Sequence, residues 1–247
     1  MRLNLYIGFA QSDEWAGWAG TYARHAQRFE AASGGTLCLV VPFTHITSAL
    51  MARLAPQAVV LSGFARSFEQ YQVSDFYEVA DWILSSRIPT LALCGSHQFL
   101  GFLTERDLRH TERLCDAPMR PLRHEEPVTN PDYHPDYFME RGYYPLTLTE
   151  AGKADSLFAG LGASPYLYES HYCEVKRLPM EFTLLASTPE CSIQAMRHRD
   201  RPLYGVQFHP EDYSERFADG RRVLENFFRL AADFHAEPDA LPIGHDA

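Results

Sequence analysis

Long apolar runs are missing from this 247-residue chain. No stretch approaches the roughly 20 apolar residues that a helix needs to cross a bilayer, so we expect no association with membranes. The N-terminal residues turn polar too early for a secretory signal. Both features predict a cytoplasmic protein.

Basic residues are also scarce. The chain has 22 Lys and Arg against 32 Asp and Glu, which gives a formal net charge of −10. Proteins that bind nucleic acid through its phosphates depend on clustered Lys and Arg, whereas a short basic patch at 197–201 is interrupted by Asp200. The charge balance therefore argues against nucleic acid as a partner.

Paired cysteines are absent too. The cysteines are Cys38, Cys94, Cys115, Cys173 and Cys191. They are odd in number and form no Cys-x-x-Cys pair, so neither a disulfide framework nor a structural zinc site is indicated. Histidine and aspartate also gather in one segment, as His124, Asp132, His134 and Asp136, but their spacing matches no standard site. We expect no metal and no cofactor.

The first part of the chain alternates predicted strands and helices. The predicted strands cover 3–9, 36–42, 58–61 and 90–93, and the predicted helices cover 14–32, 46–54, 76–86 and 98–114. Each strand is a continuous apolar run, which is typical of an α/β fold whose mostly parallel central sheet has helices on both faces. In such sheets the functional site lies beyond the carboxyl ends of the strands.

From residue 144 onward, the predicted elements are mostly short strands. Short strands are predicted at 144–148, 166–169, 182–187, 192–197 and 203–208, with a helical turn at 157–161, and we expect antiparallel additions to the sheet. An amphipathic helix is predicted at 214–234. We expect one domain over 1–235 and a flexible tail over 236–247.

An irregular insertion separates the two parts, at about 115–139. It is rich in proline and shows no clear hydrophobic periodicity. A loop of this length in a compact domain is usually functional or disordered. Two interpretations stay open: a surface loop, or a lid or contact surface for a partner or a second substrate.

The stretch from Thr90 to Gln98 carries the first chemical signal. An apolar strand ends in Cys94, and Gly95 and Ser96 follow at once, which predicts a strand that turns sharply into a helix. A cysteine at such a corner lies beside a helix N-terminus, whose partial positive charge favours the thiolate. A buried structural cysteine would give the same local pattern.

A second signal lies at His209, Pro210 and Glu211. Strand residues two apart point to the same side, and Pro210 blocks a helix, so the histidine and the glutamate can project together. A cysteine nucleophile needs a base, and the base needs a third group that holds its ring. Cys94, His209 and Glu211 are therefore the candidate catalytic residues.

Together, these two stretches resemble the class I (triad) glutamine amidotransferase family. That family has an elbow of the type Gly-x-Cys-x-Gly-x-Gln and a His-Pro-Glu that follows a Gly-Val-Gln-Phe strand. Residues 59–63 resemble its strand ending in Ser-Gly-Gly, residues 170–175 its Ser-His-x-Asp-x-Val segment, and residues 142–149 its Gly-Trp-x-Pro-Val strand. The resemblance covers most of 1–230 except about 104–139, and it implies a flavodoxin-like fold.

The resemblance implies a glutaminase reaction. A cysteine thioester would form from the side-chain amide of glutamine, and the ammonia would pass to a separate synthetase or other acceptor enzyme. The N–H groups of Gly95 and of Gly63 or Phe64 would form the oxyanion hole. The other residues carried over from the family, as substrate-binding residues, are Gln98, Ser170 and His171.

Several residues depart from the family pattern. Ala92 and Ser96 stand where the family has its elbow glycines, Phe64 replaces the second glycine of Ser-Gly-Gly, and Cys173 replaces an acidic residue. Two alternatives to the amidotransferase therefore stay open. One is a stand-alone hydrolase of γ-glutamyl amides or peptides, and the other is a non-catalytic relative that binds a ligand or a protein.

Overall fold

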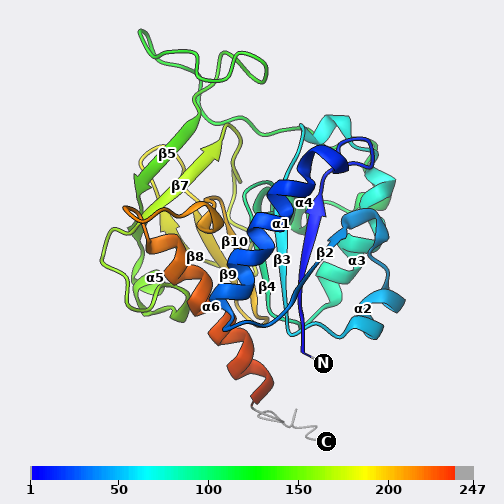
Figure 1. Cartoon of the computed structure of the whole chain (residues 1–247). Helices are drawn as coiled ribbons and strands as arrows, with labels where there is room; N and C mark the ends of the chain where they lie inside the picture. Colours follow the sequence, from blue (N-terminus) through cyan, green and yellow to red (C-terminus); the bar gives the residue numbers. More distant parts are fainter. Residues whose placement is uncertain (1, 237–247) are drawn as a thin grey trace, which may run out of the picture.

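The computed structural model describes residues 2–236. Its larger sheet contains β1 (Asn4–Phe9), β2 (Cys38–Pro42), β3 (Ala58–Phe64), β4 (Thr90–Leu93), β6 (Thr147–Leu148), β8 (Phe182–Ser187), β9 (Ala195–His198) and β10 (Leu203–Val206). The strand order is β2-β1-β3-β4-β10-β9-β8-β6. A separate two-stranded sheet pairs β5 (Glu140–Pro145) with β7 (Tyr166–His171) beside it (Figure 1).

Helices cover both faces of the larger sheet. They are α1 (Trp15–Ala32), α2 (Ser48–Leu54), α3 (Tyr77–Ser85), α4 (Gly95–Glu105), α5 (Glu150–Ala154) and α6 (Asp219–Ala236). The side chains of β1 alternate between two apolar clusters: Ile7 packs in the cluster that contains α3 and α4, and Tyr6 packs in the cluster that contains α1 and α6. Figure 1 shows α1 and α6 in front of the sheet. The predicted α/β fold is confirmed.

The direction of one strand differs from the prediction. β1, β2, β3, β4 and β10 are parallel, whereas β9, β8 and β6 add antiparallel pairs. We predicted antiparallel additions throughout the second part, but β10 runs parallel to β4. The chain between these two strands returns to the end of the sheet at which β4 begins, so Leu203 pairs with Thr90. The strands β5 and β7 also leave the main sheet and pair with each other.

Two helix boundaries are corrected as well. The helix after Cys94 ends at Glu105, because Arg106 has an extended backbone and a short 3₁₀ turn follows at Leu108–His110. The last helix begins at Asp219, since Ser214 and Phe217 close a turn through mutual hydrogen bonds of 3.1 and 3.2 Å. Of the tail predicted at 236–247, residues 237–247 lie outside the described part. Within residues 2–236, no helix is both long enough and apolar enough to cross a membrane.

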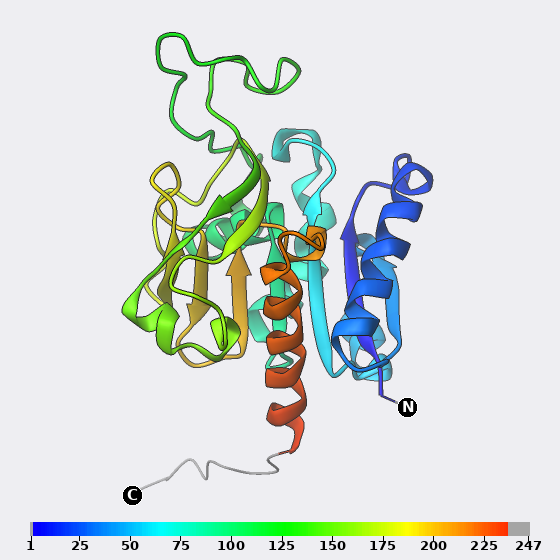
Figure 2. The ribbon, with the colours of Figure 1, turned by 60° about the vertical axis from the view of Figure 1, so that its left-hand side comes forward.

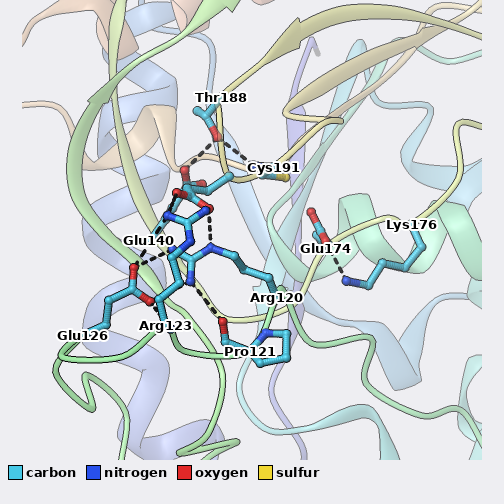
Figure 3. A network of polar contacts seen from close by, with 10 residues as sticks. Arg120, Pro121, Arg123, Glu126, Glu140, Glu174, Lys176, Thr188 and Cys191 are labelled. Atoms are coloured by element: carbon cyan, nitrogen blue, oxygen red, sulfur yellow. Dashed lines mark hydrogen bonds and ion pairs between the residues drawn. The ribbon is translucent and has the colours of Figure 1, made fainter.

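Residues 111–139 form an irregular excursion at the carboxyl end of the parallel strands (Figure 2). Isolated bridges join Pro118 to Cys173 and Pro121 to Tyr137. The guanidinium of Arg120 holds the base of the excursion through several charged contacts (Figure 3). It donates two hydrogen bonds of 2.7 Å to Glu126, contacts Glu190 through Nε, and lies 4.2 Å from the centre of the Phe138 ring. The base of the excursion is thereby fixed against the turn that precedes β9.

Candidate active site

The predicted nucleophile sits at a strained corner. β4 ends at Leu93, Cys94 follows, and α4 begins at Gly95. Cys94 has φ 48° and ψ −108°, a sparsely populated conformation that costs on the order of 1–3 kcal/mol. The Cys94 N–H donates to the carbonyl of Val206 (2.8 Å), which ties the corner to β10. The sulfur therefore lies beside the N-terminus of α4, where positive partial charge favours a thiolate.

The structure brings the other two predicted triad residues to this corner. Nδ1 of His209 lies 2.9 Å from Oε1 of Glu211, which is buried. β4 and β10 are neighbouring parallel strands that end at the same level of the sheet. A Cβ placed on Gly63 would lie 3.5 Å from Cε1 of His209 and 3.6 Å from Cβ of Cys94. Both side chains therefore pack against Gly63.

Charge at this corner favours a protonated histidine. Burial alone lowers the pKa of His209, but the negative charges of Cys94 and Glu211 outweigh burial and raise this pKa well above its usual value. Because Nδ1 is engaged by Glu211, Nε2 is the atom left to exchange a proton with the sulfur. The arrangement suits an ion pair between a thiolate and an imidazolium.

Helix α1 supports the His-Pro-Glu segment from behind. The guanidinium of Arg28 donates to the carbonyls of Glu211 and Tyr213. The Tyr143 hydroxyl donates to the carbonyl of Asp212 (2.7 Å). These bonds fix the backbone at the glutamate and in the two residues after it, so its carboxylate stays directed at the histidine ring.

The elbow accommodates its two departures from the family through specific contacts. Ser96 is fully buried, and its hydroxyl donates to the carbonyl of Ser62 at the end of β3. The Ser62 hydroxyl in turn accepts a 3.0 Å hydrogen bond from the Phe9 N–H. Ala92 pairs with Gly205 across β4 and β10. The serine thus links α4 to β3, a contact that a glycine could not make.

A cavity of about 80 Å³ opens beside Cys94. Its lining comes from the end of β3 and the residues after it, from α4, from the end of β7 and from the base of the excursion. These residues are Phe64, Arg66, Phe68, Cys94, Gly95, Gln98, Asp116, Ser170, His171, Tyr172 and Cys173. The cavity thus collects most of the predicted site residues, and its size suits one small side chain.

The predicted oxyanion residues lie around this cavity. Phe64 and Gly95 line it, and Gly63 lies between Cys94 and His209. The backbone of Gly95 opens α4, so its N–H belongs to the unpaired first turn of that helix. Their role as oxyanion donors stays a prediction.

The three predicted substrate-binding residues differ in whether their polar atoms are free to contact a substrate. Gln98 lines the cavity from α4, and the Ser170 carbonyl lies 4.0 Å from Sγ of Cys94. His171 also borders the cavity, but its Nδ1 faces the carbonyl of Cys173 and its Nε2 faces Glu140. Gln98 and Ser170 are therefore placed to meet a substrate, whereas both ring nitrogens of His171 are already engaged.

Two of the residues that were not predicted place polar groups at the site. Asp116 lines the cavity from the excursion, where its carboxylate accepts the N–H of Phe68 (2.8 Å) and lies 3.2 Å from Nε2 of His134. Gln207 directs its amide nitrogen at Sγ of Cys94, at 3.6 Å. The only sequence signal for Gln207 was its place two residues before His209, and Asp116 had none.

Several clusters of side chains could hold a metal by distance alone. Within residues 2–236, they are Asp116, His134 and Cys173; His25, Glu211 and Asp212; and Glu140, Glu169 and His171. Burial raises the pKa of the Cys173 thiol, which disfavours the thiolate that a metal needs. Glu211 is bonded to His209, and both nitrogens of His171 are occupied. The atoms that a metal would use are thus largely engaged within the protein.

Comparison with known proteins gives a consistent set of matches. The model of the family described as glutamine amidotransferase class-I matches residues 24–231. The glutamine-hydrolyzing GMP synthase subunit of Methanothermobacter thermautotrophicus is 49% identical over 74 residues, which cover 30% of this chain and 39% of that protein. The corresponding protein of Thermoplasma volcanium is 27% identical over 172 residues, 70% of each chain. The chain thus spans less than half the length of the first of these relatives.

Solved structures share the fold. A putative GMP synthase subunit from Thermoplasma acidophilum superposes with a TM-score of 0.67 and 23% identity, covering 95% of this chain and 96% of that one. The glutaminase domain of Trypanosoma brucei CTPS with bound acivicin gives a TM-score of 0.63 and 14% identity over 94% of both chains. Because the family model matches most of the sequence, this protein belongs to the class I glutamine amidotransferase family.

Proposed function

We propose that this chain is a glutaminase that hydrolyses the side-chain amide of glutamine through Cys94 and supplies ammonia to a separate acceptor enzyme. The observation that carries the proposal is the strained elbow, with Cys94 and His209 packed against Gly63 and Glu211 bonded to the histidine. Membership of the family supports the same chemistry. The steps use only protein groups and water, so the proposal includes no cofactor.

The first half of the reaction forms a thioester. The thiol proton of Cys94 already lies on His209, and the thiolate attacks the side-chain carbonyl carbon of glutamine, so that the carbonyl electrons move to oxygen. The N–H of Gly95 and that of Gly63 or Phe64 stabilise this oxyanion; loss of one such donor costs roughly 2.7–4 kcal/mol in related acyl transfers. His209 then protonates the nitrogen, the C–N bond breaks, and ammonia leaves.

The second half releases glutamate. A water molecule gives a proton to His209 and attacks the thioester carbonyl, and the thiolate of Cys94 departs. Glu211 keeps Nδ1 of the ring engaged through both halves, so the same Nε2 atom accepts and returns each proton.

The acceptor in this proposal is a synthetase on another chain. The relatives carry the name of a glutamine-hydrolyzing subunit of GMP synthase, which supports a division of labour between two chains. The excursion at 111–139 extends from the same end of the molecule as the cavity, and its base contributes Asp116 to the lining (Figure 2). A synthetase docked over the cavity would therefore meet this segment.

The test is ammonia release from glutamine by the purified full chain, alone and with a candidate synthetase. Cys94→Ala should abolish it, whereas Cys115→Ala, a change at an exposed cysteine, should not. Intact-mass analysis should find a glutamyl adduct in the wild type and none in Cys94→Ala. Absence of ammonia and of adduct under both conditions would contradict the proposal. Faster turnover of substituted γ-glutamyl amides than of glutamine would favour a stand-alone hydrolase.

A further inference from the structure

Three ionisable side chains lie buried side by side at the edge of the cavity. They are Glu140 on β5 and Glu169 and His171 on β7, with 1%, 0% and 2% of their surfaces exposed. The two strands pair so that Glu140 stands directly opposite His171. Glu169 is two residues earlier on β7 and so shares the face of His171. Burial of three ionisable groups is costly unless they are paired, so the cluster calls for an explanation.

Hydrogen bonds occupy both oxygens of the first glutamate. Oε1 of Glu140 accepts the hydroxyl of Thr188 (2.7 Å), and Oε2 accepts the amide of Gln194 (2.7 Å). Nε2 of His171 lies 2.9 Å from the same Oε2. Three donors thus converge on this carboxyl group, and each of its oxygens has a partner within the protein.

The histidine is held as an imidazolium. Its Nδ1 lies 2.9 Å from the carbonyl oxygen of Cys173, and because a carbonyl only accepts, Nδ1 carries a proton. Its Nε2 faces the carboxylates of Glu140 and Glu169 at 2.9 and 3.2 Å. Burial alone lowers the pKa of His171, but these carboxylates outweigh burial and raise the pKa to about 10.

The carbonyl of Cys173 connects His171 to Gln98, which lines the cavity. It also accepts the amide nitrogen of Gln98, at 2.9 Å. The same nitrogen lies 3.2 Å from Oε1 of Gln207, whose own amide nitrogen lies 3.6 Å from Sγ of Cys94. The amide hydrogens of Gln98 are thus used by the protein, and its Oε1 is the atom left to accept a donor from a substrate.

We propose that His171, held by Glu140, is a positioning residue for the glutamine pocket. It fixes the carbonyl of Cys173, and that carbonyl fixes the amide of Gln98 with its oxygen toward the cavity. His171 acts through this chain of bonds and does not itself bind the substrate. The inference rests on the proposed glutaminase function of the same site.

A matched pair of substitutions separates the two ring nitrogens. In His171→Asn the amide nitrogen takes the place of Nδ1 and keeps the bond to Cys173. In His171→Gln it takes the place of Nε2 and keeps the bond to Glu140. We expect His171→Gln to raise KM for glutamine about tenfold with a smaller change in kcat. His171→Asn should keep KM within about twofold of the wild type.

Stability should respond in the opposite order. His171→Asn leaves the buried Glu140 and Glu169 without the donor that lies between them, so it should unfold at lower urea concentration than His171→Gln. A purely structural role would make KM follow stability, with His171→Asn worse in both, and that result would overturn the proposal. Alkylation of Cys94 by iodoacetamide, which needs the thiolate but no glutamine pocket, should proceed alike in both variants.

A double-mutant cycle tests the route through Gln98 even if His171→Asn does not fold. Gln98→Ala should raise KM, and adding His171→Gln should raise it no further, because both changes remove the same interaction. Additive increases in KM would contradict the proposal. Failure of the wild type to hydrolyse glutamine would instead refute the glutaminase function, whereas an active wild type with unaltered KM in His171→Gln would refute this role alone.

Discussion

Gly95 packs directly against Phe64 across the corner that carries the nucleophile. A Cβ added to Gly95 would lie 2.8 Å from both the backbone nitrogen and Cδ2 of Phe64. The Phe64 ring stacks on the ring of Phe9, with centres 4.5 Å apart, so it has little freedom to withdraw. Both the backbone and the side chain of Phe64 therefore leave room only for a glycine at position 95.

Gly95→Ala should consequently damage the site. The added methyl would overlap backbone atoms, and such overpacking typically costs about 1–3 kcal/mol of unfolding free energy. It should also lower kcat, since it displaces a predicted oxyanion donor. Urea denaturation and glutamine turnover check both effects. The control is Gly20→Ala in α1, where a Cβ would meet nothing within 4 Å; equal stability of the two variants would show that the contact is unimportant.

Ser96→Ala should destabilise the chain by about 1–3 kcal/mol, because it leaves the carbonyl of Ser62 without its buried donor. Chemical denaturation measures this loss. Ser85→Ala provides the comparison, since its hydroxyl also donates to a helix carbonyl, that of Asp81, but at the surface. We expect little change there. A loss in Ser96→Ala no larger than in Ser85→Ala would mean that the elbow does not depend on the serine.

The elbow could be predicted because its signals are local. An apolar strand, a cysteine and a glycine follow one another within Thr90–Gly95, and the structure reproduces the strand over the predicted residues. The pairing with His209 and Glu211 was inferred from the base and the orienting group that a cysteine nucleophile needs, and the resemblance supported this long-range contact, which local patterns lack. The direction of β10 was missed, since hydrophobic periodicity identifies a strand but not its neighbour.

Other parts of the site depend on contacts between distant residues. Asp116 lies in a segment without periodicity, and the N–H of Phe68 and the ring of His134 place it at the cavity. His171 was predicted to bind substrate, yet its ring turns to Glu140, which is 31 residues away in sequence and directly opposite on the paired strand. Such cross-strand partners become visible only when the register is known.

Arg120→Ala should release the excursion. The guanidinium bridges Glu126, which lies in the excursion, and Glu190, which lies in the turn before β9. Its hydrogen bonds are the main cause that lowers the pKa of the Glu126 carboxylate to about 2. Without the bridge, limited proteolysis should cut within 120–137 several times faster. The melting temperature should change little, because the sheet does not depend on these contacts.

The matched control for this release is Arg109→Ala. Arg109 also forms an ion pair, but its partner Asp81 lies in α3, and both side chains are largely exposed. The cleavage pattern of Arg109→Ala should equal that of the wild type. An unchanged cleavage rate in Arg120→Ala would mean that Pro118, Pro121 and their bridges hold the segment without the arginine.

The buried imidazolium of His171 predicts how stability varies with pH. Its folded pKa of about 10 lies above the usual histidine value of about 6.5, so the folded state binds this proton more tightly than the unfolded chain. The stabilisation is therefore fully present below about pH 6.5 and is lost as the pH rises through about 10. Urea denaturation at pH 6, 8 and 10 should show this fall in the wild type and a shallower one in His171→Gln.

The control is His124→Gln, at a side chain that is 95% exposed, and this variant should keep the wild-type dependence of stability on pH. Parallel slopes in all three proteins would mean that His171 is neutral in the folded state, and that Nδ1 alone supplies the bond to Cys173.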